Sequence, residues 1–165
     1  MAIQKKVAML GFHGVGKTSL VRRFVSSIFD EKYLTTIGVK VDKKMVPLEG
    51  REVQLMLWDI AGAEDRFSVP MSFVRGSAGY LLVVDGTRAE TLDRGLELVE
   101  QVEAELGRLP FVVALNKADL VDAWQLDDGG LARLTSSQCP VFRSSAKSGE
   151  GVEEAFHALA SLAMG

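Results

Sequence analysis

The pattern of hydrophobic and polar positions along the chain predicts strands that alternate with helices. The predicted strands span residues 5–10, 39–46, 53–60, 79–85, 111–117 and 139–145. The first is a short apolar strand, and the fourth and fifth are near-continuous apolar runs, which are typical of strands covered on both faces of a sheet. The second alternates between apolar and polar side chains, so we expect a half-exposed strand, and a hairpin turn at 48–52 joins it to the third.

Amphipathic helices are predicted between these strands. Apolar residues recur at helical spacing over 16–29, 92–106 and 152–159. Strands that alternate with helices favour an α/β fold, with a mostly parallel sheet and helices on both faces. The hairpin makes one edge strand antiparallel. Ligands of such folds bind beyond the carboxyl ends of the strands, so functional residues are expected there.

The composition narrows the class of protein. A chain of 165 residues is expected to form one domain, over residues 1–165. Its net charge of −3 comes from dispersed charges, which does not favour nucleic acid or an anionic membrane as partner. Cys139 is the only cysteine, so we expect no internal disulfide and a cytoplasmic location. Neither end shows a lipidation motif, so no direct lipid anchor is expected.

A glycine-rich stretch follows the first predicted strand. Residues 11–19 read GFHGVGKTS, and Gly11, Gly16, Lys17 and Thr18 have the spacing of a phosphate-binding loop between a strand and a helix. Backbone N–H groups of such a loop surround a phosphate, the lysine reaches the outer phosphates and the hydroxyl coordinates Mg²⁺. The residues expected to line the phosphates are His13, Gly14, Val15, Gly16, Lys17, Thr18 and Ser19.

Two later strand ends carry residues suited to a guanine base. Asn116, Lys117 and Asp119 form the sequence NKAD after the fifth predicted strand. A carboxylate can accept hydrogen bonds from the guanine N1–H and the exocyclic amino group, whereas adenine has no such donor pair. After the sixth strand, Ser145, Ala146 and Lys147 offer a backbone N–H for the base carbonyl and an apolar lysine stem.

Taken with WDIAG at 58–62, these motifs resemble those of the Ras-like small GTPases, in particular Rab-type and bacterial Ras-like members. The resemblance covers nearly the whole chain. It implies a P-loop NTPase fold with a six-stranded sheet and five helices, binding of GTP and GDP with Mg²⁺, and two loops that change shape with the nucleotide. It also implies effectors, exchange factors and GTPase-activating partners at these two loops.

The resemblance assigns roles to four further residues. Thr36 matches the threonine that reports the γ-phosphate through Mg²⁺, and Gly62 matches the amide that meets that phosphate. Phe29 matches the aromatic residue over the guanine edge, and Asp59 matches the carboxylate that holds a Mg²⁺-bound water. The expected metal residues are therefore Thr18, Thr36 and Asp59.

Ala63 departs from the family pattern, because the family usually has a water-positioning glutamine there. We therefore expect slow intrinsic hydrolysis. Glu64 could reach the water, a partner could supply a side chain, or hydrolysis could simply remain slow. The expected catalytic residues are Lys17, Thr36, Gly62 and Glu64.

Other departures are weaker signals. His13 replaces a glycine of the Ras branch, and its imidazole either crowds the entry of a partner's arginine, donates to the phosphates or points into solvent. Arg66 and Arg75 are candidate internal arginine fingers, although a solvated or partner-facing role is favoured for both. Cys139 is expected in the core, and His157 on the solvent face of the last helix.

Four functions fit these observations. The leading hypothesis is a GTP-dependent switch that hydrolyses GTP slowly and is accelerated by a partner. The alternative is a GTP-binding adaptor with little or no hydrolysis. A P-loop kinase or ATPase is a third, which NKAD opposes, and the GTPase domain of a longer protein is a fourth.

Overall fold

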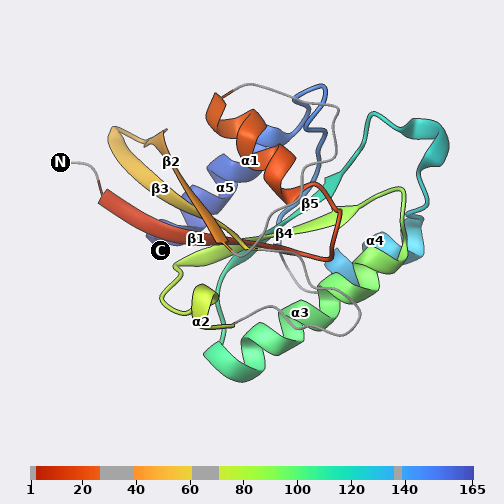
Figure 1. Ribbon diagram of the computed structural model, residues 1–165, viewed down its shortest axis with the longest axis horizontal. Coiled ribbons are helices and arrows are strands. Elements are labelled where there is room, and N and C mark those ends of the chain that lie inside the picture. Colours follow the sequence, from red (N-terminus) through yellow and green to blue (C-terminus); the bar gives the residue numbers. More distant parts are fainter. Residues whose placement is uncertain (1–2, 27–38, 61–70, 136–138) are drawn as a thin grey trace.

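A six-stranded sheet forms the centre of the molecule (Figure 1). The computed structural model describes residues 3–26, 39–60, 71–135 and 139–165, and the structural statements below concern these residues. The strands are β1 (Ile3–Gly11), β2 (Val39–Leu48), β3 (Arg51–Ile60), β4 (Gly79–Asp85), β5 (Phe111–Asn116) and β6 (Val141–Arg143).

The strand order is β2-β3-β1-β4-β5-β6. All neighbouring strands pair in parallel except β2 and β3, which form an antiparallel hairpin at one edge of the sheet. The hairpin turn lies at Glu49 and Gly50, both with positive φ (41° and 79°). The predicted fold class, a mostly parallel sheet with one antiparallel edge strand, is confirmed.

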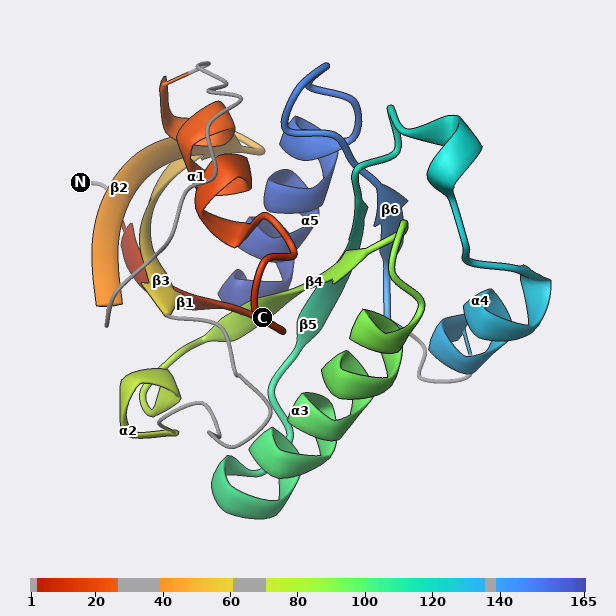
Figure 2. The ribbon, with the colours of Figure 1, turned by 45° about the vertical axis from the view of Figure 1, so that its right-hand side comes forward.

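Helices cover both faces of this sheet (Figure 2). They are α1 (Lys17–Ser26), α2 (Met71–Val74), α3 (Glu90–Leu106), α4 (Asp128–Thr135) and α5 (Val152–Met164), with a 3₁₀ turn at Val121–Ala123. α1 and α5 pack on one face, where the Phe24 and Phe156 rings stack with centroids 4.1 Å apart. α2, α3 and α4 pack on the other face, over a second hydrophobic cluster.

Successive side chains of the apolar strands point to opposite faces of the sheet and enter two different hydrophobic clusters. In β4, Leu81 and Val83 belong to the cluster under α1 and α5, whereas Tyr80, Leu82 and Val84 belong to the cluster under α3. Because both faces are covered, alternation of side-chain direction leaves no polar position within the strand. The continuous apolar run that predicted a buried strand therefore reflects two separate cores.

The structure differs from the sequence prediction mainly at element ends. The helix expected over 16–29 begins at Lys17 and is described only to Ser26. The strand expected over 139–145 spans only Val141–Arg143, because Pro140 has no N–H to donate to a strand ladder. Cys139 therefore precedes the strand, and it lies half-buried against the α3 cluster rather than deep in the core.

The resemblance implies five helices, but the hydrophobic pattern predicted no residue range for α2 or α4. α4 contains Gly129 and Gly130 in its first turn, and glycine costs about 1 kcal/mol relative to alanine in a helix. α2 has only four residues, too few for a helical period to be visible. Both short helices bury an apolar residue, Val74 of α2 and Leu134 of α4, in the cluster under α3, and this packing favours them.

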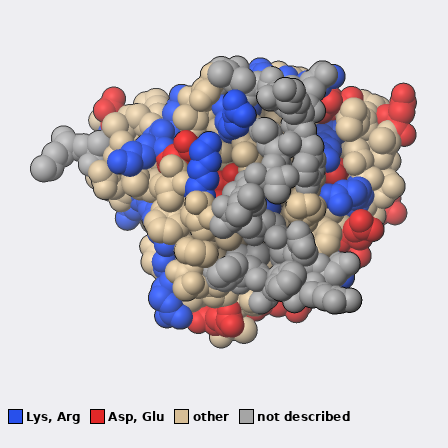
Figure 3. All heavy atoms as spheres, viewed as in Figure 1, with Lys and Arg blue, Asp and Glu red and all other residues tan. Residues whose placement is uncertain are grey.

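The described surface carries charges of both signs. Figure 3 shows Lys and Arg side chains and Asp and Glu side chains over the same visible face, as dispersed charges in the sequence predict. His157 lies exposed on α5, as predicted. No helix in the described ranges has the length and apolar composition needed to span a bilayer.

Candidate nucleotide-binding site

The phosphate-loop motif connects the carboxyl end of β1 to the first turn of α1. Gly16 has a φ of 101°, and a Cβ there would collide with the Nδ2 atom of Asn116. Only glycine combines this left-handed backbone with such a close approach. α1 begins at the next residue, Lys17, so the positive end of the helix dipole points back into the loop.

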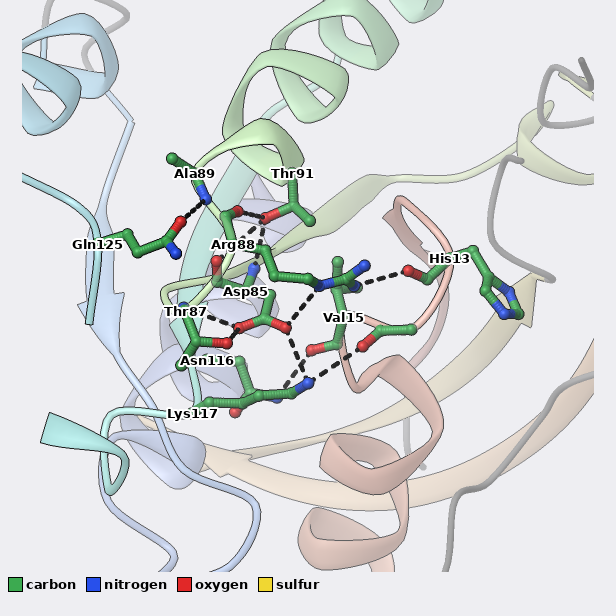
Figure 4. A network of polar contacts seen from close by, with 11 residues as sticks. His13, Val15, Asp85, Thr87, Arg88, Ala89, Thr91, Asn116, Lys117 and Gln125 are labelled. Carbon is green, nitrogen blue, oxygen red and sulfur yellow. Dashed lines mark hydrogen bonds and ion pairs between the residues drawn. The ribbon is translucent and has the colours of Figure 1, made fainter. Parts of the chain in front are cut away.

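Side chains from other strand ends hold this loop by its carbonyl groups. Asn116 Nδ2 donates to the Val15 carbonyl oxygen at 3.0 Å, and Lys117 Nζ donates to the Gly14 carbonyl oxygen at 3.3 Å. Arg88 Nη2 donates to the His13 carbonyl oxygen at 2.8 Å. The NKAD motif therefore braces the phosphate loop directly, and the two motifs form one site (Figure 4).

Lys17 is a buried cation at the centre of the loop. Its side chain is 6% exposed, and Nζ lies 3.4 Å from the Gly11 carbonyl oxygen. Burial lowers the pKa of Lys17 to about 8, while the nearby Asp59 carboxylate acts in the opposite direction. A buried ammonium is costly without a counter-charge, so this environment favours the binding of an anion.

Thr18 and Asp59 come together beside Lys17, from α1 and β3. The Thr18 hydroxyl donates to Asp59 Oδ2 at 2.6 Å. A hydroxyl and a carboxylate are oxygen ligands of the kind that Mg²⁺ prefers, and Mg²⁺ in such sites usually completes its shell with water and phosphate oxygens. These residues therefore fit a Mg²⁺ ion, which would neutralise phosphate charge, with Thr18 as ligand and Asp59 holding a bound water.

The residues predicted to recognise the base lie on the loops after β5 and β6. Ser145 Oγ donates to Asp119 Oδ1 at 2.8 Å and accepts from the Ser148 backbone N–H at 3.0 Å. This bridge orients the carboxylate that is expected to read guanine. Ala146 is buried at 5% exposure, whereas Lys147 is exposed.

α1 fixes the loop after β6. Arg23 donates through Nη1 to the Lys147 carbonyl oxygen at 3.2 Å and through Nη2 to the Ser148 carbonyl oxygen at 3.3 Å. The helix that begins at the phosphate loop therefore also positions the base loop, so the two ends of the site are held by the same element.

Asp85, at the carboxyl end of β4, was not predicted as part of the site. Its carboxylate has no exposed surface and accepts from Lys117 Nζ at 2.8 Å and Arg88 Nε at 3.0 Å. The Thr87 backbone N–H and hydroxyl donate to it at 2.9 and 2.6 Å. Burial alone would raise the pKa of Asp85, but the hydrogen bonds from Lys117 and Thr87 outweigh it and lower the pKa.

A signal for Asp85 exists in the sequence, since an acidic residue ends the buried apolar run 79–85. Arg88 carries no such signal, because a single arginine in the connection between a strand and a helix is ordinary. Its role depends on the loop geometry alone.

The described structure brings most of the predicted site residues together at one edge of the sheet. These are His13, Gly14, Val15, Gly16, Lys17, Thr18, Ser19, Asp59, Asn116, Lys117, Asp119, Ser145, Ala146 and Lys147. The His13 imidazole points away from the polar network in Figure 4. Arg75 is exposed beyond α2. Phe29, Thr36, Gly62, Ala63, Glu64 and Arg66 lie outside the described residues.

A mostly parallel sheet with a phosphate-loop motif after β1 and residues suited to a guanine base after β5 and β6 defines a P-loop nucleotide-binding domain. Comparison with known proteins identifies the family to which this domain belongs. The sequence model of the Ras family matches residues 6–164. Ras-related protein Rab7 of Pisum sativum is 35% identical over 96% of this chain and 82% of its own length.

Other relatives agree. Ras-related protein Rab-7b of Bos taurus is 35% identical over 98% of this chain and 83% of its own length. Ras-related protein SEC4 of Saccharomyces cerevisiae is 33% identical over 95% of this chain and 74% of its own length. The chain therefore belongs to the Ras family of small GTPases. It is a Rab-like GTP-binding switch that binds GTP and GDP with Mg²⁺ and acts with regulator and effector proteins.

Proposed function

We propose that this switch hydrolyses its GTP slowly and depends on a partner protein for fast turnover. The observation that carries the proposal is Ala63, which stands in WDIAGAED where Ras-type GTPases have a glutamine. That glutamine orients the attacking water, and a methyl group has neither a donor nor an acceptor to replace it. An arginine supplied by a partner accelerates the Ras-type reaction by ~10³–10⁵.

The proposal assigns roles to the nucleotide site. Lys17 and the N–H groups of residues 13–19 bind the phosphates, Thr18 and Asp59 hold Mg²⁺, and Asp119 reads guanine. The hydrogen bonds from Asn116 and Lys117 to the phosphate loop support this assignment, since they make base and phosphate recognition parts of one structure. The proposed site is completed by Phe29, Thr36, Gly62 and Glu64. We further propose that residues 1–165 form a single GTPase domain.

The proposed setting is the cytoplasm, where the single half-buried Cys139 remains a thiol. Burial raises the pKa of that thiol, so it is a poor nucleophile at neutral pH. Regulators and effectors would bind around segments 27–38 and 61–70. Fractionation of cells that express the tagged chain tests the location.

Single-turnover hydrolysis of bound GTP tests the proposed cycle. The wild type and Ala63→Gln are loaded with GTP and Mg²⁺, and bound nucleotide is separated by chromatography over hours. We expect conversion by the wild type to be slow and Ala63→Gln to raise the rate by about tenfold or more, the effect of one well-placed hydrogen bond in the transition state. Ala104→Gln, at an exposed position of α3, is the matched control.

Two results would contradict the proposal. Rapid conversion by the wild type that Ala63→Gln does not change would mean that another residue orients the water, and Glu64→Ala would then identify Glu64. Tight GTP binding without conversion in either protein, even with activating partners present, would favour an adaptor that does not hydrolyse GTP.

A further inference from the structure

Three consecutive carbonyl groups of the phosphate loop are held by side chains from outside the loop. Arg88 holds the carbonyl of His13, Lys117 holds that of Gly14, and Asn116 holds that of Val15. Arg88 comes from the β4–α3 connection and the other two from the end of β5. Figure 4 shows these donors approaching the loop from the same side.

Because of peptide geometry, these carbonyl contacts also set the direction of the N–H groups of the following residues. A trans peptide unit is planar, so its C=O and the N–H of the next residue point in opposite directions. A donor that fixes the His13 carbonyl therefore fixes the direction of the Gly14 N–H. In the same way Lys117 fixes the Val15 N–H and Asn116 fixes the Gly16 N–H. These N–H groups therefore point away from the three side-chain donors.

Arg88 is the cationic brace that the nucleotide motifs do not contain. Its Nη2 contact with the His13 oxygen is 2.8 Å, shorter than the 3.3 Å contact of Lys117 with Gly14. A charged donor on a carbonyl polarises the whole peptide unit, so the opposite N–H becomes a stronger donor. The Arg88 guanidinium is itself fixed, because Nε donates at 3.0 Å to the buried Asp85 carboxylate.

Asp85 connects the two cationic braces. Its Oδ2 accepts from both Lys117 Nζ at 2.8 Å and Arg88 Nε at 3.0 Å. One buried carboxylate therefore sets the position of two donors that hold neighbouring peptide units of the phosphate loop. If Arg88 is removed, the Asp85 carboxylate still has Lys117 as a cationic partner. The substitution therefore does not leave a buried charge without a counter-charge.

We propose that Arg88 is a positioning residue of this GTPase, which orients and strengthens the Gly14 N–H as a donor to the nucleotide phosphates. It acts through the peptide unit between His13 and Gly14 and does not itself touch the nucleotide. The inference rests on the proposed assignment of residues 13–19 to phosphate binding.

The test compares ¹⁵N-labelled wild type with Arg88→Gln and Arg88→Lys, each loaded with GDP and Mg²⁺. Glutamine places its amide nitrogen where Arg88 has Nε, so the bond to Asp85 is kept while the atoms that reach His13 are removed. The control is Arg133→Gln, which makes the same change in a half-exposed ion pair with Asp93, whose atoms lie 2.6 Å apart.

In Arg88→Gln we expect the Gly14 amide proton resonance to move upfield and GDP dissociation to become about tenfold faster, the loss of one charge-assisted hydrogen bond. For Arg88→Lys, both the Gly14 amide shift and the GDP dissociation rate should lie between those of Arg88→Gln and the wild type. An ammonium group can contact both Asp85 and a loop carbonyl, as that of Lys117 does. Arg133→Gln should match the wild type in both measurements.

An Arg88→Gln protein with an unchanged Gly14 resonance and unchanged GDP dissociation would overturn the proposal. A crystal structure of the wild-type GDP complex provides a test without a variant, and Arg88 Nη2 turned away from the His13 oxygen would also overturn it. A wild type that binds no GDP would instead refute the proposed nucleotide site, so the two failures are distinguishable.

Discussion

At the scale of single residues, Asp85 shows how a buried charge can stabilise the fold through its partners. The hydrogen bonds from Lys117 and Thr87 hold the pKa of this carboxyl below its ordinary value of 3.8, against the opposing effect of burial. A carboxyl with a lowered folded-state pKa contributes stability above the unfolded value. That stability is lost as the pH falls through the folded pKa.

Asp85→Asn is therefore expected to lower the free energy of unfolding by about 2–3 kcal/mol at pH 7. A loss nearer 2 kcal/mol is expected because the side chains of Arg88 and Lys117 are about a third exposed, at 35% and 34%. Water can therefore partly solvate these two cations when the carboxylate is removed. Urea unfolding from pH 7 to pH 3 measures the effect, and the gap between the two proteins should narrow below pH 3.8.

Asp93→Asn is the control, since its ion pair with Arg133 is more than half exposed on both sides. We expect a loss of about 0.5 kcal/mol or less from this variant. An equal effect of both substitutions would mean that the burial of Asp85 contributes nothing.

The residue scale also shows what sequence reasoning could and could not predict. Lys17, Thr18, Asn116 and Asp119 were predicted because their chemistry requires fixed spacing after a strand, and such spacing is visible in a sequence. The brace by Arg88 was missed because it joins residues 13 and 88 through a backbone carbonyl, which any residue type offers.

At the scale of elements, Gly151 is the residue that allows β6 to connect to α5. It caps α5 in the left-handed conformation, with a φ of 69°. A Cβ at this position would collide with the carbonyl oxygen of Arg143, the last residue of β6. Backbone cannot move aside as a flexible side chain can, so the turn requires glycine for two separate reasons.

Gly151→Ala is expected to destabilise the protein by about 3 kcal/mol or more, because the steric clash adds to the 1–2 kcal/mol cost of a left-handed L-residue. Gly50→Ala is the matched control, with a φ of 79° and no heavy atom within 4 Å of the added Cβ. It should cost only about 1 kcal/mol. Thermal unfolding of both variants measures the difference, and equal losses would show that the clash is relieved.

Element boundaries were the least predictable part of the fold. The strands inside the sheet were predicted well because burial on both faces leaves a continuous apolar run. The start of β6 was missed since Cys139 and Pro140 are compatible with a strand in composition, whereas the missing N–H of proline ends the ladder. The range of α4 was not predicted from the pattern, because its two glycines disfavour a helix that tertiary packing stabilises.

At the scale of the whole molecule, the proposed nucleotide site includes residues from the ends of β1, β3, β5 and β6. A ligand that contacts all of these loops is expected to stabilise the fold as a unit. With free GDP at about 1,000 times its dissociation constant, linkage adds about 4 kcal/mol to the free energy of unfolding. For a domain of this size that corresponds to a rise in Tm of roughly 10 °C.

The rise in Tm should be selective for guanine. Nucleotide-stripped protein with Mg²⁺ is expected to gain stability from GDP and GTP and to show no shift with ADP or ATP at equal concentration. Adenine offers no donor pair to Asp119, so the carboxylate would lose its solvation without a partner. Scanning calorimetry measures this, and an equal shift with ADP would contradict the assigned base site.

Asp119→Asn provides the complementary experiment with the whole domain. Asparagine can still accept the hydrogen bond from Ser145 Oγ, which lies 2.8 Å from Asp119 Oδ1, so the loop should keep its shape. Its amide group can donate to the carbonyl that xanthine has in place of the guanine amino group. We therefore expect the variant to lose most of the Tm shift with GDP and to gain one with xanthosine diphosphate, while its Tm without nucleotide stays within about 2 °C of the wild type. If Asp119→Asn keeps the full rise in Tm with GDP, the Asp119 carboxylate does not contribute to binding of the base. Guanine would then be recognised by other residues.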